Sequence, residues 1–148
     1  MRLAFIFGAA FLFMTVSACK TTVKVSNGEH PYYIHALADL RGARWMIEHR
    51  PGNWAQTNDE IEAVHHIDAA IEEIKRAAID DGKNANQHLA VDEPNEHNGR
   101  LHVSIDYLKK ARQDISRDED NLFAQGLQAR AYNHIDAAIT AVRRAIHS

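Results

Sequence analysis

The sequence predicts an all-α protein, an antiparallel four-helix bundle formed by two duplicated helical hairpins. Three observations predict this fold: an internal repeat, apolar residues that recur at helical spacing in four segments, and the lack of any segment alternating with period two. One hairpin cannot bury its apolar stripe alone, whereas two hairpins packed face to face enclose a common core. A length of 148 residues suits a single domain of this kind.

The internal repeat is clearest in the six residues His66–Ile71, which recur unchanged as His134–Ile139 at an offset of 68 residues. The same offset aligns residues 36–80 with residues 104–148 without a gap, and 14 of these 45 positions are identical. Unrelated segments would share only a few identities. We therefore expect an internal duplication.

Each repeat is predicted to contain two helices, each with one apolar stripe. The stripe members are three or four residues apart, which places them on one helix face at 100° per residue. Thr57-Asn58-Asp59-Glu60 has the form of a capping box, Gly82 stands where a C-terminal glycine belongs, and Pro51-Gly52 breaks the first hairpin. The four stripes are Tyr33, Leu37, Leu40, Arg44 and Ile47; Val64, Ile67, Ile71, Ile74 and Ala78; Leu101, Ile105, Leu108, Arg112 and Ile115; and Tyr132, Ile135, Ile139, Val142 and Ile146.

The N-terminal residues have the pattern of an export signal. Met1 and Arg2 precede an apolar run at residues 3–16, which suits a signal-peptide core and is shorter than the ~18 apolar residues of a membrane-spanning helix. The run ends in Val16-Ser17-Ala18-Cys19, which resembles a bacterial lipobox and implies cleavage before Cys19 and acylation of that cysteine. Ordinary cleavage near Ala18, leaving a free thiol, is the alternative.

The lipobox also implies a location. Lys20 follows the cysteine, and by resemblance to lipoprotein sorting signals the absence of Asp at this position favours the outer membrane over the inner one. We expect a protein that is lipid-anchored in the cell envelope and faces the periplasm. The expected organisation is a lipoprotein signal peptide at 1–18, a lipid-anchored tether at 19–29 and the bundle at 30–148, with hairpin repeats at about 30–81 and 99–148 and a connector at 82–98.

Composition argues against several classes of function. Seventeen Lys and Arg against twenty Asp and Glu give a formal charge of -3, so the chain lacks a basic surplus for phosphates and no nucleic-acid partner is expected. The single cysteine excludes an intramolecular disulfide and a cysteine-based zinc site. Neither a G-x-S-x-G motif nor a phosphate-cradling glycine loop occurs, so we expect no catalytic residues and no enzymatic activity.

Repeated charged residues are the first candidate site. Arg44 and Arg112 lie within about 20° of an apolar stripe position, where a charge is costly unless it is paired. Asp68 and Asp136 lie on the edge of the neighbouring helix of each repeat and are the expected partners. We expect either two symmetry-related buried ion pairs or arginines that hold a small anionic ligand. Burial predicts that Arg44→Ala costs about 3 kcal/mol, because a carboxylate would be stranded.

Histidines are the second candidate site, since the chain has ten of them. His66 and His134 occupy equivalent repeat positions beside a flank of alanines, where a half-buried helix contact is the first interpretation and a metal ligand the second. Glu62 lies one turn before His66 and is placed to chelate a metal with it, although Arg130 takes its place in the second repeat. Any metal binding is expected to be weak capture of Cu(II), Ni(II) or Zn(II), with no resident cofactor.

Three stretches, His30–Arg41, Ile74–Lys83 and Gly99–His102, resemble an uncharacterised group of small exported bacterial helical proteins over most of residues 30–148. This resemblance implies export and a helical fold and brings no known activity. More distantly, a histidine-rich duplicated hairpin is similar to the small periplasmic metal-binding proteins that are built of short His-containing helical repeats, which implies metal binding.

These patterns together predict a non-enzymatic, lipid-anchored helical bundle that acts in binding or structural association. The membrane is the expected partner through the N-terminal anchor, and an envelope protein is the second expected partner. The alternative function is binding of Cu, Ni or Zn ions, or of a small anionic ligand, in the periplasm. The oligomeric state stays open at this level.

Overall fold

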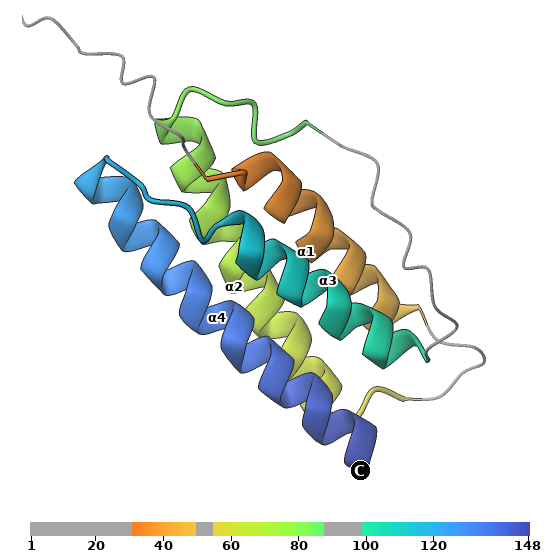
Figure 1. Cartoon of the computed structure of the whole chain (residues 1–148). Coiled ribbons are helices and arrows are strands. Elements are labelled where there is room, and N and C mark those ends of the chain that lie inside the picture. The colour runs from red at the N-terminus through yellow and green to blue at the C-terminus, as the bar shows by residue number, and fades with distance from the viewer. Residues whose placement is uncertain (1–30, 50–54, 88–98) are drawn as a thin grey trace, which may run out of the picture.

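The computed structural model describes residues 31–49, 55–87 and 99–148, and these ranges contain four helices and no strand (Figure 1). The predicted all-α class is therefore confirmed. Cys19, the signal peptide, the tether and residues 88–98 of the predicted connector lie outside the described residues. The helices are α1 (Tyr33–Glu48), α2 (Asn58–Asp80), α3 (Arg100–Asp114) and α4 (Leu122–His147).

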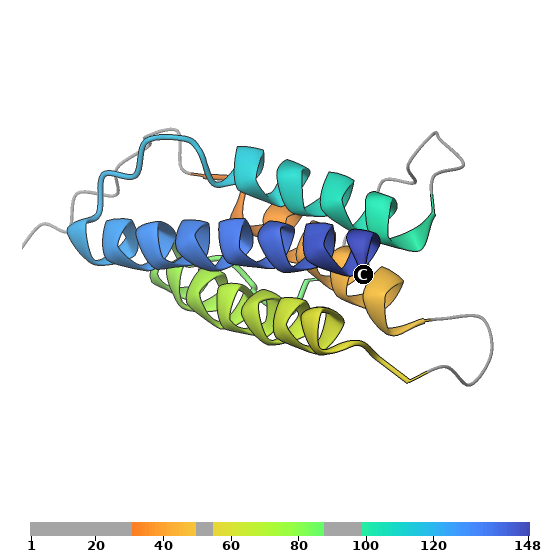
Figure 2. The same cartoon turned by 90° about the horizontal axis from the view of Figure 1, so that it is seen from below.

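The four helices pack side by side in a bundle-like arrangement. The most extensive contacts join α2 to α4 and α1 to α3, and smaller contacts join α1 to α2 and α3 to α4. Figure 2 shows α4 flanked by α2 on one side and by α3 on the other. The most extensive contacts are therefore those between helices that occupy equivalent places in the two sequence repeats.

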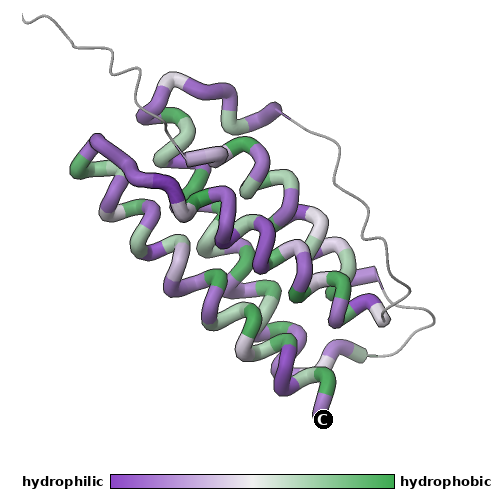
Figure 3. Tube along the Cα trace, viewed as in Figure 1, coloured by the Kyte–Doolittle hydropathy of each residue, from purple (hydrophilic) through white to green (hydrophobic). Residues whose placement is uncertain are grey.

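The core is assembled from the predicted apolar stripes. Hydrophobic positions recur along each helix and are separated by hydrophilic ones, as expected for helices with one buried face (Figure 3). Leu40 and Leu108 are both fully buried, and Ile71 and Ile139 are both almost fully buried. These two pairs of equivalent positions thus have matching burial.

Small side chains line the contact between α2 and α4, which we call the α2–α4 seam. Ala63, Ala70 and Ala77 on α2 and Ala131 and Ala138 on α4 are all fully buried. Because alanine projects only a methyl group, the two helices approach closely along these positions. The predicted alanine flank beside His66 and His134 is therefore a helix–helix contact.

The start of α2 carries the predicted capping box. The Glu60 backbone N–H donates to Thr57 Oγ1 at 3.2 Å, and the Thr57 N–H donates to Glu60 Oε2 at 2.8 Å. Arg100 joins this cap to two other helices, since its guanidinium pairs with Glu60 and donates to the Ile47 carbonyl oxygen at 3.1 Å. At the other end of α2, Gly82 has a φ of 69°, in the left-handed region that favours glycine.

At the end of the molecule where α2 ends, the start of α1 is held by the end of α3 and by the loop that leads into α4. The Tyr32 N–H donates to the Asp114 carbonyl oxygen at 2.9 Å, and the buried Tyr33 hydroxyl donates to Glu119 Oε2 at 2.7 Å. We call this end, where α1 and α4 begin and α2 and α3 end, the N-terminal end of the bundle (Figure 1).

Candidate functional site

The four predicted arginine and aspartate residues are brought together in two pairs. Arg44 Nε on α1 lies 3.3 Å from Asp68 Oδ1 on α2, and it also donates to Glu48 Oε1 at 3.2 Å. Arg112 Nε on α3 donates to Asp136 Oδ1 on α4 at 2.8 Å. Each pair therefore links the two helices of one sequence repeat at equivalent positions.

These ion pairs are not buried, and the expectation of burial is wrong. The Arg44 side chain is 43% exposed and the Arg112 side chain 48%, and their aspartate partners are exposed to a similar extent. A long aliphatic stem lets a guanidinium leave the apolar stripe and reach water, although its Cα lies on the buried side of the helix. The Asp136 hydrogen bond raises the pKa of Arg112. An anionic ligand would have to displace a carboxylate at either arginine.

Exposure changes the expected effect of removing these arginines. Arg44→Ala and Arg112→Ala should each lower the free energy of unfolding by less than about 1 kcal/mol, because exposed ion pairs are screened by solvent. Urea denaturation followed by circular dichroism measures both losses. A loss near 3 kcal/mol for either variant would contradict the solvent-exposed geometry and would agree instead with a buried ion pair.

The two repeated histidines meet on the α2–α4 seam. His66 Nδ1 lies 3.3 Å from His134 Nδ1, and the two ring centroids are 5.6 Å apart with the ring planes at 38°. Both side chains are half-buried. Each histidine thus contacts its own repeat equivalent, in agreement with the interpretation as a helix contact.

Burial and the neighbouring histidine disfavour protonation of His66. Burial lowers the pKa of His66, and the positive charge that His134 would carry lowers it further, while Glu62 opposes the shift. A neutral pair can share one N–H···N hydrogen bond, because each ring has one protonated and one unprotonated nitrogen. A doubly protonated pair would place two like charges in contact.

The lowered pKa of His66 predicts that the free energy of unfolding decreases at acidic pH. The unfolded chain binds this proton at a pKa near 6.5 and the folded chain binds it less readily, so the contribution to stability is present above pH ~6.5 and is lost as the pH falls below that value. Thermal melts between about pH 7.5 and 5.5 measure the loss. His66→Gln should flatten this pH dependence, and the matched change His35→Gln on α1 should leave it as in the wild type; equal slopes in all three proteins would contradict the expectation.

Glu62, the third candidate metal ligand, forms an ion pair with an arginine of α4. Its Oε2 accepts from Arg144 Nη2 at 2.7 Å, and Arg144 Nε donates to Asp59 Oδ1 at 2.8 Å. The structure therefore places Glu62 in an ion pair between α2 and α4, and a metal ion held by Glu62 and His66 would have to compete with Arg144 for this carboxylate. Within residues 31–49, 55–87 and 99–148, no group of three or more His, Cys, Asp and Glu side chains is arranged to hold a metal ion.

A further ion pair along the seam, like the pairs of Arg144, was not predicted from the sequence. Arg130 Nη2 donates to Glu73 Oε2 at 2.9 Å, and this hydrogen bond lowers the pKa of Glu73, whose side chain is nearly buried. The repeat gave no signal for it, because the equivalent positions are occupied by Glu62 and Ala141. The histidine pair thus lies between two ion pairs that cross from α2 to α4.

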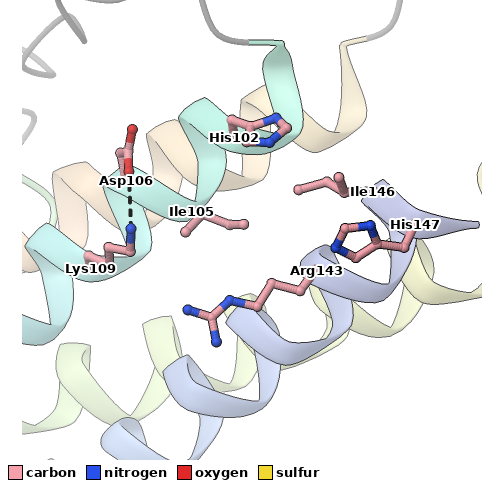
Figure 4. A pocket seen from close by; sticks show the side chains of 7 residues that line it. All are labelled: His102, Ile105, Asp106, Lys109, Arg143, Ile146 and His147. Atoms are coloured by element: carbon pink, nitrogen blue, oxygen red, sulfur yellow. Dashed lines mark hydrogen bonds and ion pairs between the residues drawn. The ribbon is translucent and has the colours of Figure 1, made fainter.

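A hollow of about 310 Å³ lies between α3 and α4 (Figure 4). Its apolar part comes from Ile105 and Ile146, and its polar side chains include His102, Arg143 and His147. Lys109 and Asp106 also line it and pair with each other at 3.4 Å. This hollow could not be predicted from the repeat, because its histidines have no counterpart in the first repeat, where isoleucines stand at 34 and 79.

A second hollow of about 260 Å³ opens between α1 and α3 and is mainly apolar. Gly42, Trp45 and Met46 on α1 and Tyr107 on α3 line it, with Arg41 at its edge. Trp45 is half exposed and stacks on the His49 ring, with centroids 4.3 Å apart. The sequence contained no signal for this site beyond the presence of the tryptophan.

The chain matches no protein-family model, no curated protein and no solved structure. In the part of the chain that the structure describes, no helix combines the length and the apolar character needed to cross a bilayer.

Proposed function

We propose that this chain is a non-enzymatic helical bundle, lipid-anchored through Cys19 in the cell envelope and facing the periplasm, that acts by association with an envelope protein. The observation that carries the association is the half-exposed Trp45 at the apolar hollow between α1 and α3. Tryptophan beside an apolar pocket is the side chain that contributes most often to protein–protein affinity.

The underlying architecture is inferred to be an antiparallel bundle of two duplicated hairpins. Asp59, early in α2, pairs with Arg144, late in α4, whereas Glu73, late in α2, pairs with Arg130, early in α4. Such pairing is expected of helices that run in opposite directions. The contact of His66 with its own repeat equivalent is what a two-fold axis between the repeats would produce, because only residues beside the axis meet their counterparts.

Site-specific photo-cross-linking in cells tests the association. A photoreactive phenylalanine analogue at position 45 should give a discrete cross-linked product, because this position lines the proposed contact. Position 140, an exposed threonine on α4, is the matched control and should give none. The same cross-linking pattern at both positions would contradict the proposal.

Acylation is tested separately. The wild-type chain should incorporate a fatty-acid analogue and remain with the membrane fraction, and Cys19→Ala should lose the label and appear as a soluble periplasmic species. Labelling that persists in Cys19→Ala would contradict the anchor.

One observation favours metal-ion binding as a second candidate function. The 3.3 Å between His66 Nδ1 and His134 Nδ1 is close to the edge of a tetrahedron around a metal ion with metal–nitrogen bonds of about 2.0–2.1 Å. Two imidazoles at this spacing suit tetrahedral Zn(II) best, with water in the remaining positions, whereas Cu(II) and Ni(II) prefer tetragonal geometry. Such a site binds weakly, because only two ligands come from the protein.

Calorimetric titration of the tag-free chain with copper, nickel and zinc tests this candidate. Binding at about 10⁻⁵ M is expected, and it should be abolished in His66→Gln/His134→Gln. The matched control is His102→Gln/His147→Gln, which removes the same number of histidines and should bind as the wild type does. Binding no tighter than about 10⁻⁴ M in the wild type would exclude a metal function for the pair.

A further inference from the structure

Several large apolar side chains are exposed at the N-terminal end of the bundle. Leu122 is 83% exposed, Ile79 64% and Phe123 62%, and Tyr32 is also half exposed. Leu122 and Phe123 are the first two residues of α4, Ile79 belongs to the last turn of α2, and Tyr32 immediately precedes α1. Three segments that are distant in the sequence therefore each present a large apolar side chain at one end of the molecule.

Leu122 and Phe123 are presented by the capped start of α4. Asn121 Oδ1 accepts from the Phe123 N–H at 2.9 Å and so caps α4. The Asn121 side-chain amide also hydrogen-bonds to Asp80 and thereby joins the start of α4 to the end of α2. Leu122 and Phe123 consequently begin a helix whose start is joined to the end of α2, and the last turn of α2 carries Ile79.

The described chain begins at this same end. The Pro31 carbonyl oxygen accepts from Lys83 Nζ at 3.3 Å, so the entry into α1 is held beside the end of α2. Residues 20–30 can span at most about 36 Å when fully extended. The 26-residue helix α4 is itself about 39 Å long. A chain anchored at Cys19 therefore holds the N-terminal end within one tether length of the bilayer, whereas the opposite end lies a further helix length away when the bundle stands upright.

We propose that the N-terminal end of the bundle rests on the bilayer that carries the anchor, with Leu122, Phe123 and Ile79 in contact with lipid. This inference rests on the proposed acylation of Cys19. The tether confines the end to the vicinity of the surface, so that a few apolar side chains suffice for contact that they could not maintain from free solution. Exposed Asp118 and Asp120 lie in the loop before α4, so the contact suits zwitterionic lipid and weakens as anionic lipid is added.

Lipid contact can be read out with one label per chain. Cys19 is the only cysteine and is blocked by acylation in the proposed form, so an introduced cysteine is the only free thiol. The full lipidated chain carrying Phe123→Cys, labelled with bimane, is reconstituted in phosphatidylcholine vesicles that contain spin-labelled lipid. Ile61→Cys is the matched control, because Ile61 is exposed to a comparable extent but lies in the first turn of α2 at the opposite end.

Quenching by spin-labelled lipid should be at least about threefold stronger at position 123 than at position 61. A label at Ile79→Cys should be quenched as well, and Leu122→Asp/Phe123→Asp should remove that quenching without unfolding the chain, because both altered side chains face solvent. Replacing part of the phosphatidylcholine by phosphatidylglycerol should reduce the quenching at position 123.

The outcomes separate the contact from the anchor. Equal, weak quenching at positions 123 and 61 in a chain that stays with the vesicles would overturn the lipid contact and leave the anchor intact. A change in emission at position 123 that depends on the protein-to-lipid ratio would identify a second copy as the occupant and would also overturn it. A chain that lacks the acyl group and washes off the vesicles would overturn both.

Discussion

Replacing Leu40 or Leu108 by alanine should lower the free energy of unfolding by about 3 kcal/mol in each case. Both side chains are fully buried, on α1 and α3 respectively, and they occupy equivalent positions of the two sequence repeats. Each substitution removes buried methyl groups and leaves a cavity that the surrounding helices fill only in part. Urea denaturation of the two variants measures the losses.

The control for this pair is Leu122→Ala. Its side chain is largely exposed, so the change should cost less than about 0.5 kcal/mol. A loss below about 1 kcal/mol for either Leu40→Ala or Leu108→Ala would contradict the equivalence of the two positions in the core. Equal large losses would support the inference that the bundle is a duplicated hairpin.

Tyr33→Phe should cost about 2 kcal/mol, because it removes a buried hydrogen bond to a charged group. The Tyr33 hydroxyl donates to Glu119 Oε2 at 2.7 Å, and both residues are buried. Without the hydroxyl, Glu119 retains the Asn121 N–H on its other oxygen but has lost a donor inside the protein. Urea denaturation at neutral pH measures the cost, and Tyr32→Phe, at a half-exposed neighbour, is the control.

The same tyrosine also gives stability a dependence on alkaline pH. Burial first, and then the hydrogen bond to Glu119, raise the pKa of Tyr33 far above its ordinary value of about 10. The folded chain keeps a proton that the unfolded chain loses, so this contribution is fully present below pH ~10 and is lost as the pH rises above it. The difference between the wild type and Tyr33→Phe should therefore shrink above pH ~10, and a constant difference would contradict the assignment.

Local patterns predicted a large part of the fold. Spacings of three and four residues located the four helices, and the Thr57–Glu60 cap formed as expected because a capping box depends only on residues one turn apart. The repeated Arg44–Asp68 and Arg112–Asp136 pairs were also anticipated. Those pairs depend on the contact between adjacent helices of one repeat, which a short loop makes nearly obligatory.

The predictions made from helical-wheel positions were wrong for the burial of the arginine side chains. A position on a helical wheel gives the direction of the Cα–Cβ bond, but an arginine can carry its charge several ångströms away from that direction. Arg44 therefore begins near the core and ends in solvent. The helical wheel likewise gave no indication that Glu62 pairs with Arg144 on α4.

The amino-acid sequence by itself determined the helical class, the positions of the four helices and the residues that fill the core, because helix formation and the one-sided burial of apolar residues depend on spacing within each segment. Only the tertiary structure decided that α2 lies against α4, that His66 meets His134 there, and that Leu122, Phe123 and Ile79 share one exposed end. These features depend on the axial register between helices that are far apart in the chain, and no periodicity within one segment specifies that register.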